Sequence, residues 1–108
     1  MHVMQRRALE GLFVGGLILM ERQVIERQIK LLDEEGVSFR GATARAMVDA
    51  IRAILATEEV VDFVSVGETM KKQGTFDSAG GAEAMVNLAR AFTGDAHRVE
   101  QMASQLAR

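Results

Sequence analysis

Apolar residues recur along this chain at the spacing of an α-helix, with polar residues between them. The last stretch is typical, because Val99, Met102, Ala103 and Leu106 stand at positions i, i+3, i+4 and i+7. The same periodicity predicts helices over residues 4–19, 22–33, 43–56, 66–73, 81–91 and 96–107. The chain is also rich in strong helix formers and has no proline. We therefore predict an all-α fold, a compact bundle of about six short helices.

The first predicted helix is apolar on most of its surface, which predicts a central position in the bundle. Gly15 and Gly16 interrupt it, and each costs about 1 kcal/mol of helix stability relative to alanine. Either another helix approaches closely at this pair, or the pair marks a kink. The apolar run over residues 11–20 is about half as long as a membrane-spanning helix needs. We interpret it as a buried core helix and expect no membrane partner.

Local signals mark several helix ends. Gly36 and Gly74 are placed to end the second and fourth helices in the left-handed conformation. Thr43 is a plausible N-cap for the third helix. Ser65 and Glu68 form a Ser-x-x-Glu pattern, which predicts a capping box at the start of the fourth helix.

Two connections between helices have their own predictions. The β-branched stretch over residues 60–66 is the only β-like segment, and we do not predict a strand there. In the loop before the third helix, Phe39 is expected to fill part of the core. Asp77 or Ser78 is expected to cap the fifth helix.

Composition narrows the class of protein. A length of 108 residues fits one domain, and 13 basic against 15 acidic residues give a net charge of −2. Strong non-specific binding to nucleic acid is not expected from that balance. The chain has no cysteine, which excludes disulfides and thiolate metal sites, and His2 and His97 lack ligand spacing. A cytoplasmic protein is the simplest interpretation.

No catalytic constellation is recognisable. The phosphate-loop pattern G-x-x-x-x-G-K-[ST] of motor ATPases is missing from the sequence. Gly80 and Gly81 precede a predicted helix and could cradle an anion, although a tight turn with close packing explains them as well. His97 is expected on the surface rather than as a base. We therefore expect no enzyme activity and no catalytic, cofactor-binding or metal-binding residues.

The stretch over residues 61–88 resembles the N-terminal domain of DnaB-type replicative DNA helicases. The shared features are an acidic residue, a hydrophobic–Ser–hydrophobic segment, a helix with glutamate, and then glycine, a hydrophobic residue and a glycine pair. In this chain they are Asp62, Val64, Ser65, Val66, Glu68, Met70, Gly74, Phe76, Gly80 and Gly81. Residues 10–19 are similar to the opening helix of the family, and nearly the whole chain follows the family pattern.

The resemblance implies a helical head followed by a helical hairpin, with no catalytic role. In the family, these domains associate into a collar above a hexameric motor, and the collar docks primase and sometimes loaders. Residues 1–108 are accordingly expected to form a single interaction domain, the head with the first arm of a possible hairpin. Two regions depart from the family, because residues 41–47 and 82–84 lack the aromatic side chains that often occur there. These departures put surface contacts in question, whereas the core pattern is intact.

Three functional hypotheses follow. The chain is the N-terminal domain of a helicase, with self-association as a homodimer or higher oligomer and docking of primase or a helicase loader as its role. Alternatively, it is a stand-alone phage or plasmid protein of this fold, which binds helicase or primase as an adaptor or inhibitor. The third is an unrelated helical DNA-binding regulator, with a basic patch from Arg6, Arg7, Arg90, Arg98 and Arg108.

The last two predicted helices carry the candidate protein interface. Their apolar residues offer more area than a small head is expected to cover. They are Leu88, Phe92, Val99, Met102 and Leu106. The alternative is that these side chains pack on the first helix.

Overall fold

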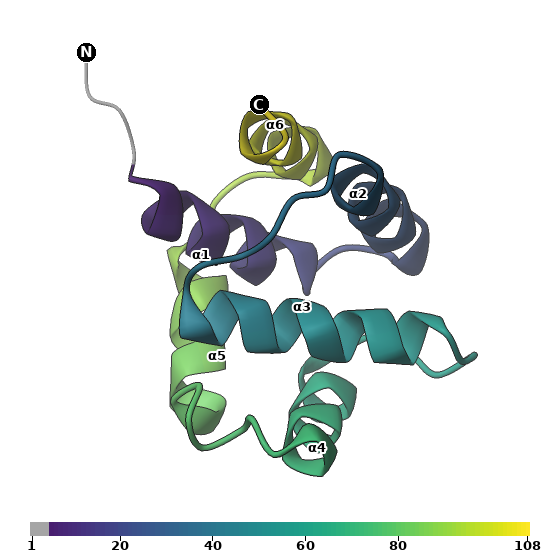
Figure 1. Ribbon diagram of the computed structural model, residues 1–108, viewed down its shortest axis with the longest axis vertical. Coiled ribbons are helices and arrows are strands. Elements are labelled where there is room, and N and C mark those ends of the chain that lie inside the picture. Colours follow the sequence, from purple (N-terminus) through teal and green to yellow (C-terminus); the bar gives the residue numbers. More distant parts are fainter. Residues whose placement is uncertain (1–4) are drawn as a thin grey trace.

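The computed structural model describes residues 5–108, and over that range it contains six α-helices and no β-strand (Figure 1). In chain order they are α1 (Arg6–Leu17), α2 (Arg22–Glu34), α3 (Ala42–Leu55), α4 (Phe63–Gln73), α5 (Gly81–Ala91) and α6 (Ala96–Leu106). The predicted all-α fold class is confirmed. No helix in this part of the chain is long and apolar enough to cross a membrane.

The six helices share one hydrophobic core, and α1 lies in the middle of the bundle. Helix α1 contacts α3, α5 and α6, while α3 packs on α4 and α2 packs on α6 (Figure 1). Phe13 and Leu17 of α1 are completely buried. Phe39 from the α2–α3 loop stacks on Phe13, with the ring centroids 6.1 Å apart. The predictions of a central first helix and of a core role for Phe39 are both confirmed.

The glycines of α1 allow α5 to lie directly against it. A Cβ atom at Gly15 would collide with the backbone of Leu88, and one at Gly16 would collide with the ring of Phe92. At Gly11, the nearest atom to such a Cβ is Leu88 Cδ2, at 2.9 Å. Close approach of another helix, rather than a kink, is therefore the reason for the glycine pair.

The start of α4 differs from the prediction by one turn. The N-cap is Asp62, whose Oδ1 accepts from the Ser65 backbone N–H at 2.8 Å, while the Asp62 N–H donates to Ser65 Oγ at 3.0 Å. The capping box is thus Asp62–Ser65, and the predicted Ser65–Glu68 box is wrong. Val61 and Val66 flank this cap as the two halves of a hydrophobic staple and are both buried. Their burial places the helix start at Phe63.

Two other predicted caps are also corrected. Gly41 occupies the N-cap of α3, and the Thr43 hydroxyl instead donates to the carbonyl oxygen of Ala79 at 2.6 Å. Gly80 occupies the N-cap of α5, so neither Asp77 nor Ser78 has that role. The predicted ends at Gly36 and Gly74 are confirmed, because both glycines have positive φ angles, 66° and 76°.

The observed and the predicted capping box of α4 can be distinguished by their effects on the free energy of unfolding. Replacing an N-cap aspartate with alanine typically costs about 1 kcal/mol. We therefore expect Asp62→Ala to lower the free energy of unfolding by about that amount in urea titrations followed by circular dichroism. The exposed Glu68 is the control, and Glu68→Ala should change it by less than about 0.5 kcal/mol. Equal losses for the two variants would contradict the assignment of the cap to Asp62.

Candidate protein-interaction surface

The structure corrects the placement of the five residues proposed as an interface. Phe92, Val99, Met102 and Leu106 are exposed by only 7%, 0%, 4% and 1%. They lie in the core because α1 approaches α5 closely through its glycines and also contacts α6. Helix α1 thereby covers the apolar faces of α5 and α6. Leu88 is half-buried against Gly11 and Gly15 of α1. The alternative, in which these residues pack on the first helix, describes their positions.

The family-motif residues shape the segment from α4 to α5. Asp62 and Ser65 start α4, Gly74 ends it, and Gly80 precedes the first turn of α5. The ring of Phe76 lies between the two helices, with the Lys71 ammonium 4.9 Å from its centroid. The motif Glu68 is exposed on α4, with Oε1 3.5 Å from Lys71 Nζ. Each of these positions has a structural explanation.

The Gly80–Gly81 turn does not present free N–H groups to an anion. The Gly80 N–H donates to the carbonyl oxygen of Asp77 at 3.0 Å, and the Gly81 N–H donates to that of Phe76 at 2.9 Å. Gly81 also faces the Phe76 ring, with a Cβ position 3.6 Å from Cε2. The tight turn with close packing is therefore the interpretation that the geometry favours.

A buried ion pair near the amino end of α1 was missed by sequence reasoning. The Glu10 carboxylate is completely buried, and its Oε2 lies 3.2 Å from Arg6 Nε. Its Oε1 accepts from the backbone N–H groups of Arg40 and Gly41, both at 2.8 Å, and so satisfies the start of α3. The Arg6 guanidinium also donates to the carbonyl oxygen of Leu106, at 3.3 Å, near the end of α6.

The signal for this pair was present in the helical spacing. Glu10 stands three, four and seven residues before Phe13, Val14 and Leu17, on the apolar face of the first helix. A carboxylate on such a face needs hydrogen-bond donors when it is buried. Arg6, one turn earlier, is the donor that the sequence offers.

The basic patch proposed for DNA binding is partly used inside the fold. Arg6 is the partner of Glu10, and Arg98 bonds to Thr93 and lies 5.6 Å from the centroid of the Phe92 ring. Arg7, Arg90 and Arg108 are exposed. Two of the five arginines therefore serve the structure of the chain itself.

The surface offers apolar contacts elsewhere. Among residues 5–108, three large hydrophobic side chains are exposed, Leu19 by 52%, Val60 by 70% and Val64 by 73%. Val60 and Val64 are four residues apart and lie on either side of the Asp62 cap at the start of α4. These two valines are named the α4 corner below.

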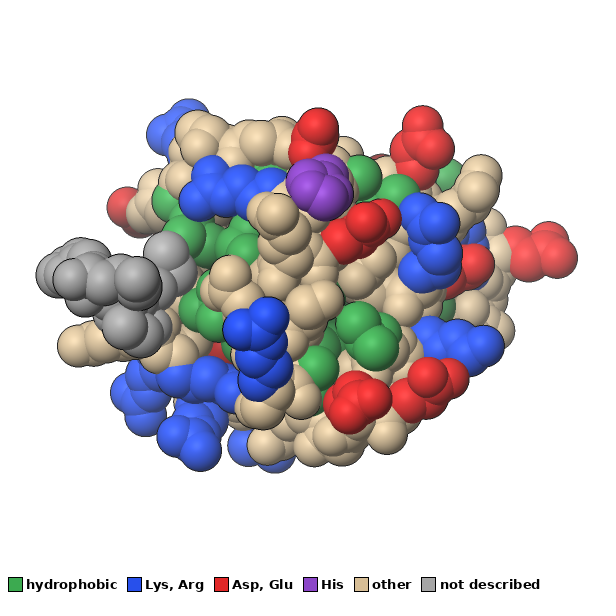
Figure 2. Space-filling view, turned by 90° about the horizontal axis from the view of Figure 1, so that it is seen from above, with side chains coloured by type: hydrophobic (Ala, Val, Ile, Leu, Met, Phe, Trp, Pro, Cys, Tyr) green, Lys and Arg blue, Asp and Glu red, His purple; other side chains and the backbone are tan. Residues whose placement is uncertain are grey.

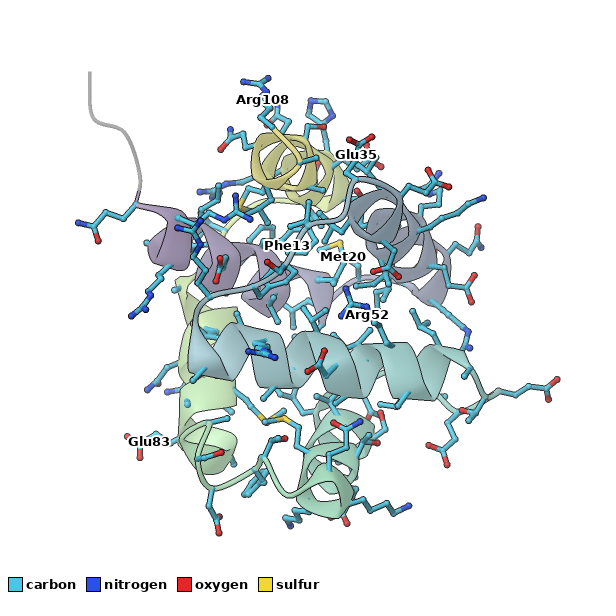
Figure 3. All side chains as sticks on the ribbon, in the orientation of Figure 1. Phe13, Met20, Glu35, Arg52, Glu83 and Arg108 are labelled. Carbon is cyan, nitrogen blue, oxygen red and sulfur yellow. The ribbon has the colours of Figure 1, made fainter. Side chains whose placement is uncertain are left out.

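A groove of about 450 Å³ also runs between α2 and α3, with Ile29, Leu55 and Ala56 in its lining. Two arginines link α2 and α3 in opposite directions. Arg52 on α3 bonds to Asp33 Oδ1 on α2 at 2.7 Å, and Arg22 on α2 donates to the carbonyl oxygen of Leu55 at 3.2 Å. Figure 3 shows Arg52 rising from α3 towards α2.

Over residues 5–108, no group of three or more acidic, histidine or cysteine side chains is arranged to hold a metal ion.

Comparison with known proteins identifies the family. A search of curated proteins found no match. The family model described as the DnaB-like helicase N terminal domain matches residues 6–108. The family resemblance of residues 61–88 is confirmed, and the chain belongs to the DnaB-like helicase N-terminal domain family.

Proposed function

We propose that this chain is a non-catalytic interaction domain of the bacterial or phage DNA replication machinery, acting in the cytoplasm. Its role is to associate with copies of itself and to dock primase or a helicase loader. The observation that carries the proposal is the family match over residues 6–108, which includes all six helices. The N-terminal domain of this family is non-catalytic.

The domain is proposed to act as one unit. The core draws side chains from all six helices, and α6 contributes Val99, Met102, Ala103 and Leu106 to it. Helix α6 packs on α1 and α2 rather than standing apart from them. Its further role as the first arm of a hairpin stays a prediction.

The α4 corner is proposed as a contact with a second copy of the chain. Val60 and Val64 are the most exposed large apolar side chains among those described. Burying a valine that is otherwise in water contributes roughly 1.5–3 kcal/mol. Two such side chains on each copy form the centre of a weak symmetric contact, in which the same patch serves both partners.

Sedimentation equilibrium tests this function. The pure chain is measured alone and then mixed with a primase C-terminal domain. A dimer or larger species that binds primase is the expected result. A chain that stays monomeric at high concentration and does not bind primase would remove the main support for the proposal.

A variant pair locates the contact. Val60→Asp combined with Val64→Asp should shift the chain towards monomer. Val64 is the second residue of α4, and the helix dipole stabilises a negative charge in the first turn of a helix. Val64→Asp should therefore not unfold the domain. Ala82→Asp is the matched control, because Ala82 is the exposed second residue of α5. Equal association of the two variants would place the contact elsewhere.

A further inference from the structure

Two hollows lie side by side along the exposed face of α3. One, of about 410 Å³, is bounded by Arg40, Arg45 and the loop residues Thr75 and Ser78. The other, of about 310 Å³, lies towards the α2–α3 loop and includes Val37, Arg45 and Arg52. Both include Arg45 and Asp49, which form a ridge between them on successive turns of α3. We call this surface the α3 face.

The α3 face carries an excess of positive charge. Arg40, Arg45 and Arg52 line it, whereas Asp49 is the single acidic residue in the lining of either hollow. This excess occurs in a chain whose net charge is −2. Seen from above, the charges of the molecule as a whole are unevenly spread, with several Lys and Arg side chains at the lower left of the view and most Asp and Glu side chains on its right (Figure 2).

Two of these arginines have no acidic partner within the described residues. Asp49 Oδ1 lies 3.2 Å from Arg52 Nη1, and Arg52 also bonds to Asp33 at 2.7 Å. Within residues 5–108, neither Arg40 nor Arg45 has a carboxylate oxygen within 4.0 Å, and both are exposed. Their guanidinium groups therefore keep their full donor capacity for an outside ligand.

The base of the Arg40 side chain is held in place. Its backbone N–H donates to the buried Glu10 carboxylate at 2.8 Å, and so does that of Gly41. Arg45 stands on the first turn of α3, a regular helix. Both side chains thus start from fixed backbone positions, and less conformational entropy is lost when a ligand orders them.

We propose that the α3 face binds an acidic segment of a partner protein, with carboxylates on Arg40 and Arg45. Arginine guanidinium groups pair with carboxylates in a planar, two-pronged geometry, which suits an Asp/Glu-rich peptide. The small side chains of Ala42 and Ala46 leave room for such a peptide beside the guanidinium groups. The inference rests on the proposed function, since it assumes that this domain docks other replication proteins.

A protein ligand is favoured over single-stranded nucleic acid by the absence of a stacking surface. Proteins that bind single strands combine a basic groove with exposed aromatic rings. The one aromatic residue lining the two hollows is Phe39, which is only 6% exposed and is stacked on Phe13. The α3 face therefore has the charge that a single strand requires but lacks the stacking platform.

Nuclear magnetic resonance titrations of the ¹⁵N-labelled chain test the inference. The probes are a primase C-terminal domain, an oligo-glutamate peptide and oligo-thymidine. The first two should shift the amide signals of Arg40, Arg45 and Asp49, and added salt should weaken both. Arg40→Glu combined with Arg45→Glu should weaken binding about tenfold, since each change turns an attraction into a repulsion. Arg90→Glu is the control, because Arg90 is exposed on α5 and lines neither hollow.

The outcomes separate this inference from the proposed function. Unchanged binding of peptide and primase by the double variant would overturn the inference and leave the proposed function intact. If the unaltered chain does not bind primase, the primase-docking part of the proposed function fails, and the peptide titration alone decides the inference. Tighter binding of oligo-thymidine than of the peptide to these amides would overturn it in favour of nucleic acid. A thermal melt of the double variant should match that of the control, because neither arginine contributes an ion pair within the described residues.

Discussion

Glu10→Ala is expected to remove about 3 kcal/mol from the free energy of unfolding. The change takes away the acceptor of the Arg40 and Gly41 N–H groups and leaves the Arg6 guanidinium without its carboxylate. Removing one partner of a fully buried ion pair costs roughly 3–5 kcal/mol. The lower figure applies because Arg6 is one-third exposed, so water partly screens its lost interaction. Urea unfolding followed by circular dichroism measures the loss.

The chain contains a matched control for this change. Arg22 and Glu26 repeat the pairing of Arg6 and Glu10, with the same residue types in the same order at the same i,i+4 spacing. The Glu26 side chain is 52% exposed, so its pairing is worth little in water. Glu26→Ala should therefore change the free energy of unfolding by less than about 0.5 kcal/mol. Comparable losses for Glu10→Ala and Glu26→Ala would show that burial and the start of α3 do not set the cost.

The helices were predictable because their information is local. Apolar residues at helical spacing located all six, and the left-handed glycines marked two of the ends. The start of α4 was misplaced because two overlapping patterns, Asp62-x-x-Ser65 and Ser65-x-x-Glu68, both fit a capping box. The choice between them depends on burial of Val61 and Val66 against other helices. That packing cannot be obtained from one segment.

The interaction surface was less predictable than the fold, and for a physical reason. An apolar side chain such as Met102 has the same chemistry in a core as in an interface, and only the tertiary arrangement decides which it joins. Here α1 decides, because its glycines bring α5 close and leave Phe92 covered. Arg40 and Arg45 line the same hollow on the α3 face only because of how the α2–α3 loop folds onto α3. Single charges in a sequence do not reveal such a cluster.

The same closeness of α1 and α5 makes Gly15 the second sensitive position. Alanine at this position is favoured by intrinsic helix propensity, by about 1 kcal/mol. Its Cβ would, however, occupy the place of the Leu88 carbonyl group, and backbone cannot move aside as a flexible side chain can. The helices would have to separate, which opens the core around Phe13 and Phe92. We expect Gly15→Ala to lower the free energy of unfolding by about 2 kcal/mol, within the range for overpacked cores.

Gly67 supplies the opposite case within the same chain. It is also a buried glycine inside a helix, but a Cβ there would lie 3.6 Å from the Phe76 ring, an ordinary packing distance. Gly67→Ala should therefore raise the free energy of unfolding by about 0.5–1 kcal/mol, because helix propensity acts without a collision. Thermal and urea unfolding of the two variants should move in opposite directions. If Gly15→Ala were also stabilising, α1 and α5 could not lie in backbone contact, and the burial of Phe92 that depends on that contact would have to be revised.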